Sequence, residues 1–187
     1  MRILAISCSE KRNGNTEKLV DSFAKGALEA GHELHVLRLS ELDVHGCRGC
    51  NACAETDKCV QKDDMQQIYQ EFIACDAVVM AGPLFFWGMP AQMKAVIDRL
   101  YALGHDNEKG YYAYPCKKCA LIASAADTER HFWVFESFVN YWHRYISYMR
   151  WEDLGCLLVG SCGGTKQPRR IEKTDGLSRA YAFGKAM

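Results

Sequence analysis

The stretch RILAISCSEKRNGNTEKLV, residues 2–20, decides the expected fold. Its residues from Ile3 to Ile6 form a short apolar run without charge, which is typical of a strand buried on both faces. A polar segment follows, and a helical pattern begins near Thr16 and ends at Gly31. The stretch therefore predicts a strand, a polar loop and the start of a helix.

The loop after this strand has the composition of an anion-binding site. A helix that begins near Thr16 leaves its first backbone N–H groups without intrahelical acceptors, at the positive end of the helix dipole. Gly14 allows close approach of the backbone, and hydroxyl, amide and cationic side chains surround it. We therefore expect a phosphate group near Ser7, Ser9, Lys11, Arg12, Asn13, Gly14, Asn15 and Thr16. An ordinary turn with an Asn-Thr helix cap is the alternative.

Two missing motifs narrow the choice of phosphate ligand. A dinucleotide-binding loop would read G-x-G-x-x-G, but Gly14 is the only glycine before Gly26. A P-loop would continue from glycine into Lys-Ser/Thr, whereas Gly14 is followed by Asn15. A single phosphomonoester, such as that of FMN, needs only one ring of donors. The loop therefore favours FMN over FAD.

The composition limits the class of protein. A chain of 187 residues with 49% hydrophobic residues is most simply one domain over residues 1–187. The 23 basic and 23 acidic residues give zero net charge, which argues against a nucleic-acid partner, and the apolar runs are too short to cross a membrane. Because the chain has no signal-peptide pattern, we expect a soluble, cytoplasmic protein. Its ten cysteines are then expected to serve reactivity, metal binding or burial rather than structural disulfides.

Strand and helix patterns alternate along the chain. Strands are expected at residues 3–6, 33–39, 77–81, 120–124 and 156–160, helices at 16–30, 63–73, 90–103, 132–149 and 176–185, and mobile loops at 104–115 and 163–173. This alternation predicts an α/β fold with a doubly wound parallel sheet. In such a sheet, ligands bind at the carboxyl ends of the strands.

Two further strand ends are candidates for the ligand site. The third strand runs into GPLFFWGMP, whose three successive aromatic residues cannot all enter one core, so at least one is expected to await a planar partner such as a flavin ring. The fourth strand ends in small residues that allow close approach. The expected ring contacts are Phe85, Phe86 and Trp87, with close approach at Ser124 and Ala125. A contact between subunits is the alternative for the aromatic residues.

The aromatic content also predicts self-association, as a homodimer or homotetramer. The segment FWVFESFVNYWHRYISYMRW, residues 132–151, holds more rings than one helix face can bury against a sheet. A thick core in a monomer is the alternative.

Arg99 follows the aromatic loop and is expected to pair with a carboxylate or a helix end, without a chemical role.

Four cysteines lie close together in GCRGCNACAETDKC, at Cys47, Cys50, Cys53 and Cys59. Spacings of two, two and five residues allow the four thiols to converge on one centre, and thiolate-only ligation at this spacing suits a [4Fe-4S] cluster. A Cys₄ zinc site more often splits into two distant CxxC pairs. Zinc, free thiols and disulfides remain alternatives, because spacing alone does not establish coordination.

Three motifs in this order resemble the NADPH-dependent FMN reductase family, in its iron-sulfur flavoprotein branch. They are S-x-S-x-x-x-x-GNT at residues 7–16, CxxCxxCx5C followed by KDDM at 47–65, and PLFFWGMPAQMKAVIDR at 83–99. The resemblance implies a flavodoxin-like sheet of order 2-1-3-4-5 and FMN held by the loops after strands one, three and four. It implies that Ser7, Ser9, Asn15 and Thr16 bind the phosphate, and that Pro83, Leu84, Phe85, Phe86, Trp87 and Gly88 flank the ring. It also implies associated subunits and a cluster on the four cysteines. Many relatives have tyrosine where this chain has Phe85.

The leading functional hypothesis is an FMN-dependent oxidoreductase of the NAD(P)H:acceptor reductase type. Its electron donor or acceptor would be a small molecule or a protein. The first alternative is an iron-sulfur flavoprotein that transfers electrons from ferredoxin-type donors. The second is a non-catalytic redox-sensing module that holds the same flavin.

Overall fold

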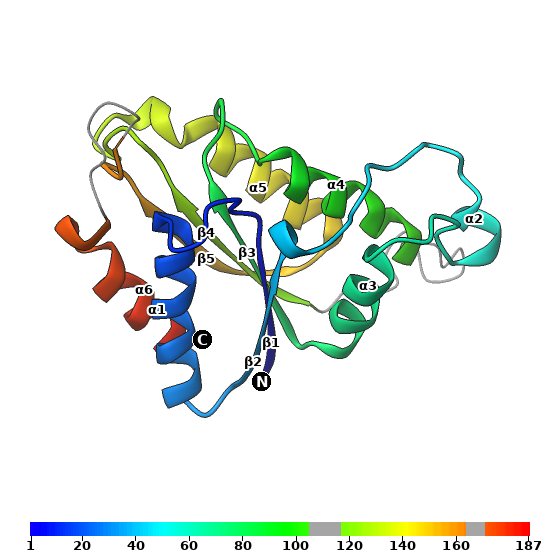
Figure 1. Ribbon diagram of the computed structural model, residues 1–187, viewed down its shortest axis with the longest axis horizontal. Coiled ribbons are helices and arrows are strands. Elements are labelled where there is room, and N and C mark those ends of the chain that lie inside the picture. Colours follow the sequence, from blue (N-terminus) through cyan, green and yellow to red (C-terminus); the bar gives the residue numbers. More distant parts are fainter. Residues whose placement is uncertain (105–116, 164–170) are drawn as a thin grey trace.

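The computed structural model describes residues 1–104, 117–163 and 171–187. A five-stranded parallel sheet in the order β2-β1-β3-β4-β5 crosses its centre (Figure 1). The strands are β1 (Arg2–Ser7), β2 (Glu33–Arg38), β3 (Ala77–Pro83), β4 (Lys118–Ser124) and β5 (Glu152–Val159). This strand order confirms the predicted doubly wound sheet.

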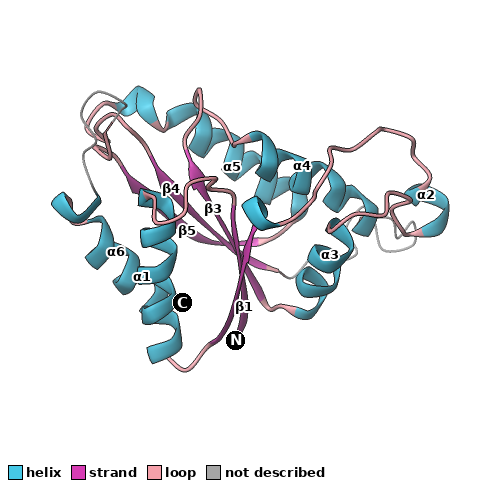
Figure 2. Cartoon of the chain, in the orientation of Figure 1, coloured by secondary structure: helices cyan, strands magenta, loops and turns pink. Residues whose placement is uncertain are grey.

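Helices cover both faces of the sheet (Figure 2). One face is covered by α1 (Asn15–Glu29) and α6 (Gly176–Lys185), and the other by α3 (Met65–Ala74), α4 (Ala91–Arg99) and α5 (Glu136–Met149). The strands alternate accordingly, because Ile3 and Ala5 pack toward α1 while Leu4 and Ile6 pack toward α3 and α4. Both faces of β1 are therefore buried, as its uninterrupted apolar sequence predicts.

Helices α1 and α6 cross closely because each has a glycine at the contact. A Cβ at Gly26 would lie 2.0 Å from the carbonyl oxygen of Tyr181, and a Cβ at Gly184 would lie 2.1 Å from that of Phe23. These distances are shorter than any carbon–oxygen contact, so a larger residue at either position would force the helices apart. The close crossing brings the end of the chain against its first helix.

The element boundaries differ from the predicted ones at both strand and helix ends, and β5 begins four residues before the predicted strand 156–160. The predicted helix 90–103 consists of α4 and a 3₁₀ segment at Leu100–Leu103, and the predicted helix 132–149 consists of a 3₁₀ segment at Phe132–Val134 followed by α5. Two more 3₁₀ segments lie at Leu39–Glu41 and Ile171–Lys173. Most of the two predicted mobile loops, 104–115 and 163–173, lies outside the described residues. None of the described helices is long and apolar enough to cross a lipid bilayer.

The four-cysteine segment extends from the end of β2 past α3 and α4 (Figure 1). It is largely irregular and contains one short helix, α2 (Cys53–Thr56). Asp64 anchors its first part, because the Asp64 carboxylate accepts a hydrogen bond from the backbone N–H of Asp43 at 2.7 Å. The segment thus begins and ends on the start of α3.

Candidate functional site

The carboxyl ends of the strands bring together the loops that the sequence singles out. Backbone hydrogen bonds connect neighbouring loops, from Cys8 N to Ala81 O at 2.9 Å and from Leu84 N to Ser124 O at 2.7 Å. The first loop, the aromatic loop after β3 and the end of β4 therefore lie at one edge of the sheet. This is the edge where open α/β sheets bind ligands.

The start of α1 offers backbone donors at this edge. The first hydrogen bond of the helix runs from Lys18 N to Gly14 O at 3.1 Å, and the cap residue Gly14 has no side chain to occupy the helix end. Within the described residues, no hydrogen bond is recorded for the backbone N–H groups of Asn15, Thr16 or Glu17. Three free N–H groups at the positive end of a helix are suited to a phosphate group. This part of the chain therefore fits the phosphate of FMN.

The polar side chains of the first loop are engaged inside the protein. The Thr16 hydroxyl lies 2.8 Å from the Ser124 hydroxyl, and the Asn15 amide donates to the Cys162 carbonyl at 2.8 Å. Ser7 is fully buried and its hydroxyl donates to the Glu17 carboxylate. These side chains fix the shape of the loop, so the free donors at the helix start belong to the backbone.

Glu17 lies beside the helix start and was not among the predicted residues. Its buried carboxylate accepts hydrogen bonds from Ser7 and from Nε of Arg38, the latter at 2.7 Å. This hydrogen bond from Arg38 is the main reason that the guanidinium pKa lies above its usual value, although burial opposes the shift. The Glu17 carboxylate beside the helix start is therefore paired with the Arg38 guanidinium. A glutamate in the first helical turn was the available sequence signal.

Arg12 and Asn13 of the first loop are exposed, whereas Ser9 is buried. Asn13 has a left-handed backbone (φ 58°), and Arg12 forms an exposed ion pair with Glu41 at 3.2 Å. The Ser9 hydroxyl donates to the Lys11 carbonyl at 3.4 Å.

The aromatic loop forms a tight turn. Phe85 and Gly88 exchange backbone hydrogen bonds of 3.3 and 3.0 Å, and the two central residues, Phe86 and Trp87, have φ values of 45° and 61°. Such a turn normally takes Asn or Gly at these positions, because bulky residues there are strained. Phe86 is 95% exposed, and the Trp87 ring contacts Trp133 with centroids 6.4 Å apart.

Several neighbours of the aromatic loop support it. Pro83 ends β3 and Leu84 packs partly against the core, while Ser124 and Ala125 are buried at the end of β4. The arrangement leaves aromatic faces open beside the helix start, and one of these faces could stack on a planar ring.

The four cysteines line one cavity of about 250 Å³ on the outer side of the chain. Cys47 and Cys50 are exposed, Cys53 and Cys59 are half-buried, and all four are free thiols. Burial raises the pKa of the Cys53 thiol, and the three neighbouring thiols add to this shift. Four soft sulfur donors around one cavity match the donor set of an iron-sulfur cluster. Among the described residues, however, no three potential ligands already converge closely enough to hold a metal ion.

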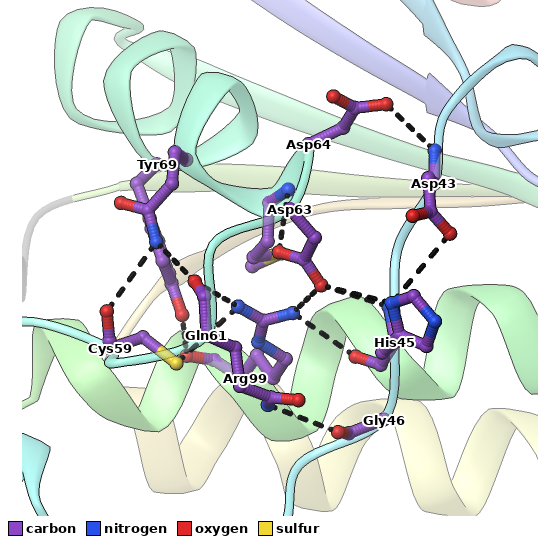
Figure 3. Close-up of polar contacts among 11 residues, drawn as sticks. Asp43, His45, Gly46, Cys59, Gln61, Asp63, Asp64, Tyr69 and Arg99 are labelled. Atoms are coloured by element: carbon purple, nitrogen blue, oxygen red, sulfur yellow. Dashed lines mark hydrogen bonds and ion pairs between the residues drawn. The ribbon is translucent and has the colours of Figure 1, made fainter.

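Arg99 connects α4 to this cavity (Figure 3). Its side chain is completely buried, it forms an ion pair with Asp63, and its Nη2 donates to Cys59 Sγ at 3.3 Å. Burial alone would raise the pKa of the Cys59 thiol, but hydrogen bonds from the Gln61 backbone and from Arg99 outweigh it, so the pKa lies below its usual value. The predicted carboxylate partner of Arg99 is therefore Asp63, while the sulfur contact was not predicted.

A family profile and the sequences of curated proteins show which known proteins the chain resembles. The profile of the NADPH-dependent FMN reductase family matches residues 1–133. An iron-sulfur flavoprotein of Methanosarcina thermophila is 36% identical over 107 residues, which cover 57% of this chain and 56% of that protein. The chain spans about half the length of the curated relatives it matches.

Solved structures show the same fold. An NAD(P)H:quinone oxidoreductase from Methanothermobacter marburgensis superposes with a TM-score of 0.76 at 17% identity, covering 99% of this chain and 96% of that one. An FMN-dependent NADH-azoreductase from Bacillus anthracis, solved in complex with FMN, superposes with a TM-score of 0.72 at 12% identity, covering 99% and 98%.

Proposed function

The chain belongs to the NADPH-dependent FMN reductase family, and we propose that it is an FMN-dependent oxidoreductase that passes electrons from NAD(P)H to an acceptor. The observation that carries this proposal is the start of α1, where three backbone N–H groups have no acceptor among the described residues, beside the exposed rings of the aromatic loop. When bound, FMN supplies the chemistry, because it takes up two electrons with a proton and releases them to the acceptor.

The residues proposed to hold FMN divide by role. The helix-start N–H groups bind the phosphate, and Ser7, Asn15 and Thr16 keep the loop in shape through their internal hydrogen bonds. The loop residues Ser9, Arg12, Asn13 and Gly14 surround the phosphate. Residues 83–88, with Ser124 and Ala125, flank the ring, which the exposed faces of Phe86 and Trp87 are free to contact.

The test is to purify the protein, release its flavin by heat and identify it by chromatography. FMN in stoichiometric amount supports the proposal, whereas FAD contradicts it. The purified protein should oxidise NADPH or NADH with a quinone, flavin or dye as acceptor. Thr16→Glu should abolish flavin binding, because its carboxylate faces a dianion at the helix start. Thr16→Ser keeps the hydroxyl and is the matched control.

A second candidate function is supported by the four-cysteine cavity. Here Cys47, Cys50, Cys53 and Cys59 would hold a [4Fe-4S] cluster, and a ferredoxin-type protein would deliver electrons one at a time. The curated relatives named iron-sulfur flavoprotein support this second candidate.

Iron and acid-labile sulfide, measured on anaerobically purified protein, test the cluster. About four irons per chain, lost in Cys50→Ser and retained in the control Cys156→Ser, are the expected result. Full flavin content without iron would remove the cluster, and stoichiometric zinc would replace it with a zinc site. Flavin that a reduced ferredoxin bleaches but NAD(P)H does not would favour the carrier over the NAD(P)H-dependent enzyme.

Two further properties belong to this proposal. The exposed rings of Phe86, Trp87 and Phe132 favour a homodimer or homotetramer. A mass of 21 kDa in a sedimentation experiment, which is the mass of one chain, would contradict it. Exposed free thiols at Cys47 and Cys50 favour the reducing cytoplasm, which fractionation of cells that produce the protein would test.

A further inference from the structure

The guanidinium of Arg99 lies between the two chain segments that enter and leave the cysteine cavity. Arg99 is the last residue of α4 and its side chain has no exposed surface. Its Nη1 donates to the carboxylate of Asp63, after the cavity, and to the carbonyl of His45, before the cavity, the latter at 3.2 Å (Figure 3). One planar group therefore holds both stems of the cysteine segment.

The second nitrogen of the fork points at the cavity. Nη2 donates to Cys59 Sγ at 3.3 Å and to the carbonyl of Gln61 at 3.5 Å. In the described part of the chain, Cys59 is the one cavity cysteine whose sulfur has a recorded contact with a charged side chain. The Tyr69 hydroxyl donates to the backbone carbonyl of Arg99 at 2.8 Å and so fixes the end of α4.

We propose that Arg99 is a positioning residue for the cluster-binding cysteines, which ties the two stems together and donates an N–H···S hydrogen bond to Cys59. The inference rests on the cluster of the proposed function. A cationic donor to a ligand sulfur stabilises negative charge, so it holds iron more firmly and favours the reduced cluster.

Arginine is required for this arrangement by geometry. A guanidinium presents its donors in a rigid planar fork, so one side chain can reach a carboxylate, two carbonyls and a sulfur. A lysine ammonium could keep the ion pair with Asp63 but could not hold the second arm toward Cys59. Asp63 in turn makes the buried charge tolerable, since an unpaired buried charge is strongly destabilising.

The experiment compares Arg99→Lys with the wild-type protein and with Arg2→Lys. Arg2 pairs with Glu71 at the amino end of β1, so it controls for an arginine replaced elsewhere. We expect Arg99→Lys to keep its FMN, to release iron to a chelator about tenfold faster, and to lower the cluster reduction potential measured in an EPR-monitored titration. We expect Arg2→Lys to match the wild type in all three.

A second variant guards against misfolding of the first. The double variant Arg99→Gln with Asp63→Asn removes both charges together, so no buried charge is left unpaired. It should also release iron faster and lower the potential. An unchanged potential in an iron-loaded variant overturns the proposal. Loss of FMN in both variants overturns it too, because Arg99 would then be a general structural residue.

Failure of the cluster itself is recognised separately. If wild-type protein contains no iron, the proposal of a cluster is wrong. Amide hydrogen exchange on the same iron-free protein then tests whether Arg99 holds the two stems of the cysteine segment together. Residues 43–46 and 59–63 should exchange about tenfold faster in Arg99→Lys than in the wild type or Arg2→Lys. Equal exchange in all three proteins would contradict the positioning role.

Discussion

Replacing Asn15 by aspartate separates two explanations of the first loop. If the Asn15 amide contacts the phosphate, the substitution affects flavin binding alone. In the structure, however, Nδ2 donates to the Cys162 carbonyl at 2.8 Å while Oδ1 accepts from the Ile171 backbone at 3.1 Å. The amide thus ties the phosphate loop to the segment after β5. We therefore expect Asn15→Asp to destabilise the flavin-free protein as well.

The size of the effect follows from the 2.8 Å contact, which would join a carboxylate to a carbonyl oxygen. A full charge facing about half a charge, at an effective dielectric constant of about 20, costs about 3 kcal/mol. Loss of the hydrogen bond adds about 1 kcal/mol, and a carboxylate in the first turn of α1 returns about 0.5 kcal/mol. Solvent screening at this half-buried site reduces the total, so we expect a loss of about 2–3 kcal/mol at pH 7.

The assay is urea unfolding of flavin-free protein between pH 3 and pH 8, for wild type, Asn15→Asp and Asn13→Asp. The carbonyl raises the pKa of Asp at position 15 above its unfolded value of about 3.9, and a protonated carboxyl can donate to Cys162. The deficit should therefore be small below pH 4 and grow as the pH rises. Asn13 is exposed, so its variant should stay within about 0.5 kcal/mol of wild type. A stable flavin-free Asn15→Asp protein that has lost FMN binding would refute this reasoning.

Three further outcomes are expected from urea unfolding. Gly184→Ala should cost about 2 kcal/mol or more despite its better helix propensity, because the new Cβ meets the Phe23 backbone, and no side-chain movement relieves that contact. Burial raises the pKa of Asp63, but the hydrogen bond from Arg99 outweighs it, so stability from this pair should be present above about pH 4 and lost below it, and Asp63→Asn should flatten that dependence. Trp142→Phe should cost less than the roughly 3–5 kcal/mol of a tryptophan-to-alanine change, because the buried indole N–H has no hydrogen-bond partner among the described residues.

Local sequence patterns predicted the alternating strands and helices of a doubly wound sheet, whereas its strand order was predicted from the family resemblance. The apolar run at residues 3–6 became a fully buried strand, and the helix at 176–185 has the predicted bounds. The close crossing of α1 and α6 was not predictable, because a glycine inside a helical pattern does not reveal its partner. The crossing depends on Gly26 and Gly184, which are far apart in the sequence and become neighbours only through the sheet order.

The candidate site was predictable as a set of loops but not as a set of contacts. Composition identified hydroxyl and amide groups near a helix start, and it could not show that Ser7 and Thr16 would use theirs on Glu17 and Ser124. The same applies to Arg99, whose contact with Cys59 joins residues 40 positions apart. A local motif locates donors, whereas only the folded chain determines which donors remain free.

The aromatic turn after β3 exposes two rings at the ligand-binding edge of the sheet. Phe86 and Trp87 each adopt a left-handed backbone, which costs on the order of 1–3 kcal/mol for a bulky residue. Folding does not recover this cost by burial, because Phe86 is almost fully exposed and Trp87 is about half exposed. The strain is therefore compensated elsewhere in the chain, and it holds two rings at the ligand-binding edge of the sheet. A turn of Asn-Gly would form more easily but would present no ring. The sequence thus favours exposed aromatic surface over the easier turn at the edge where the proposed flavin binds.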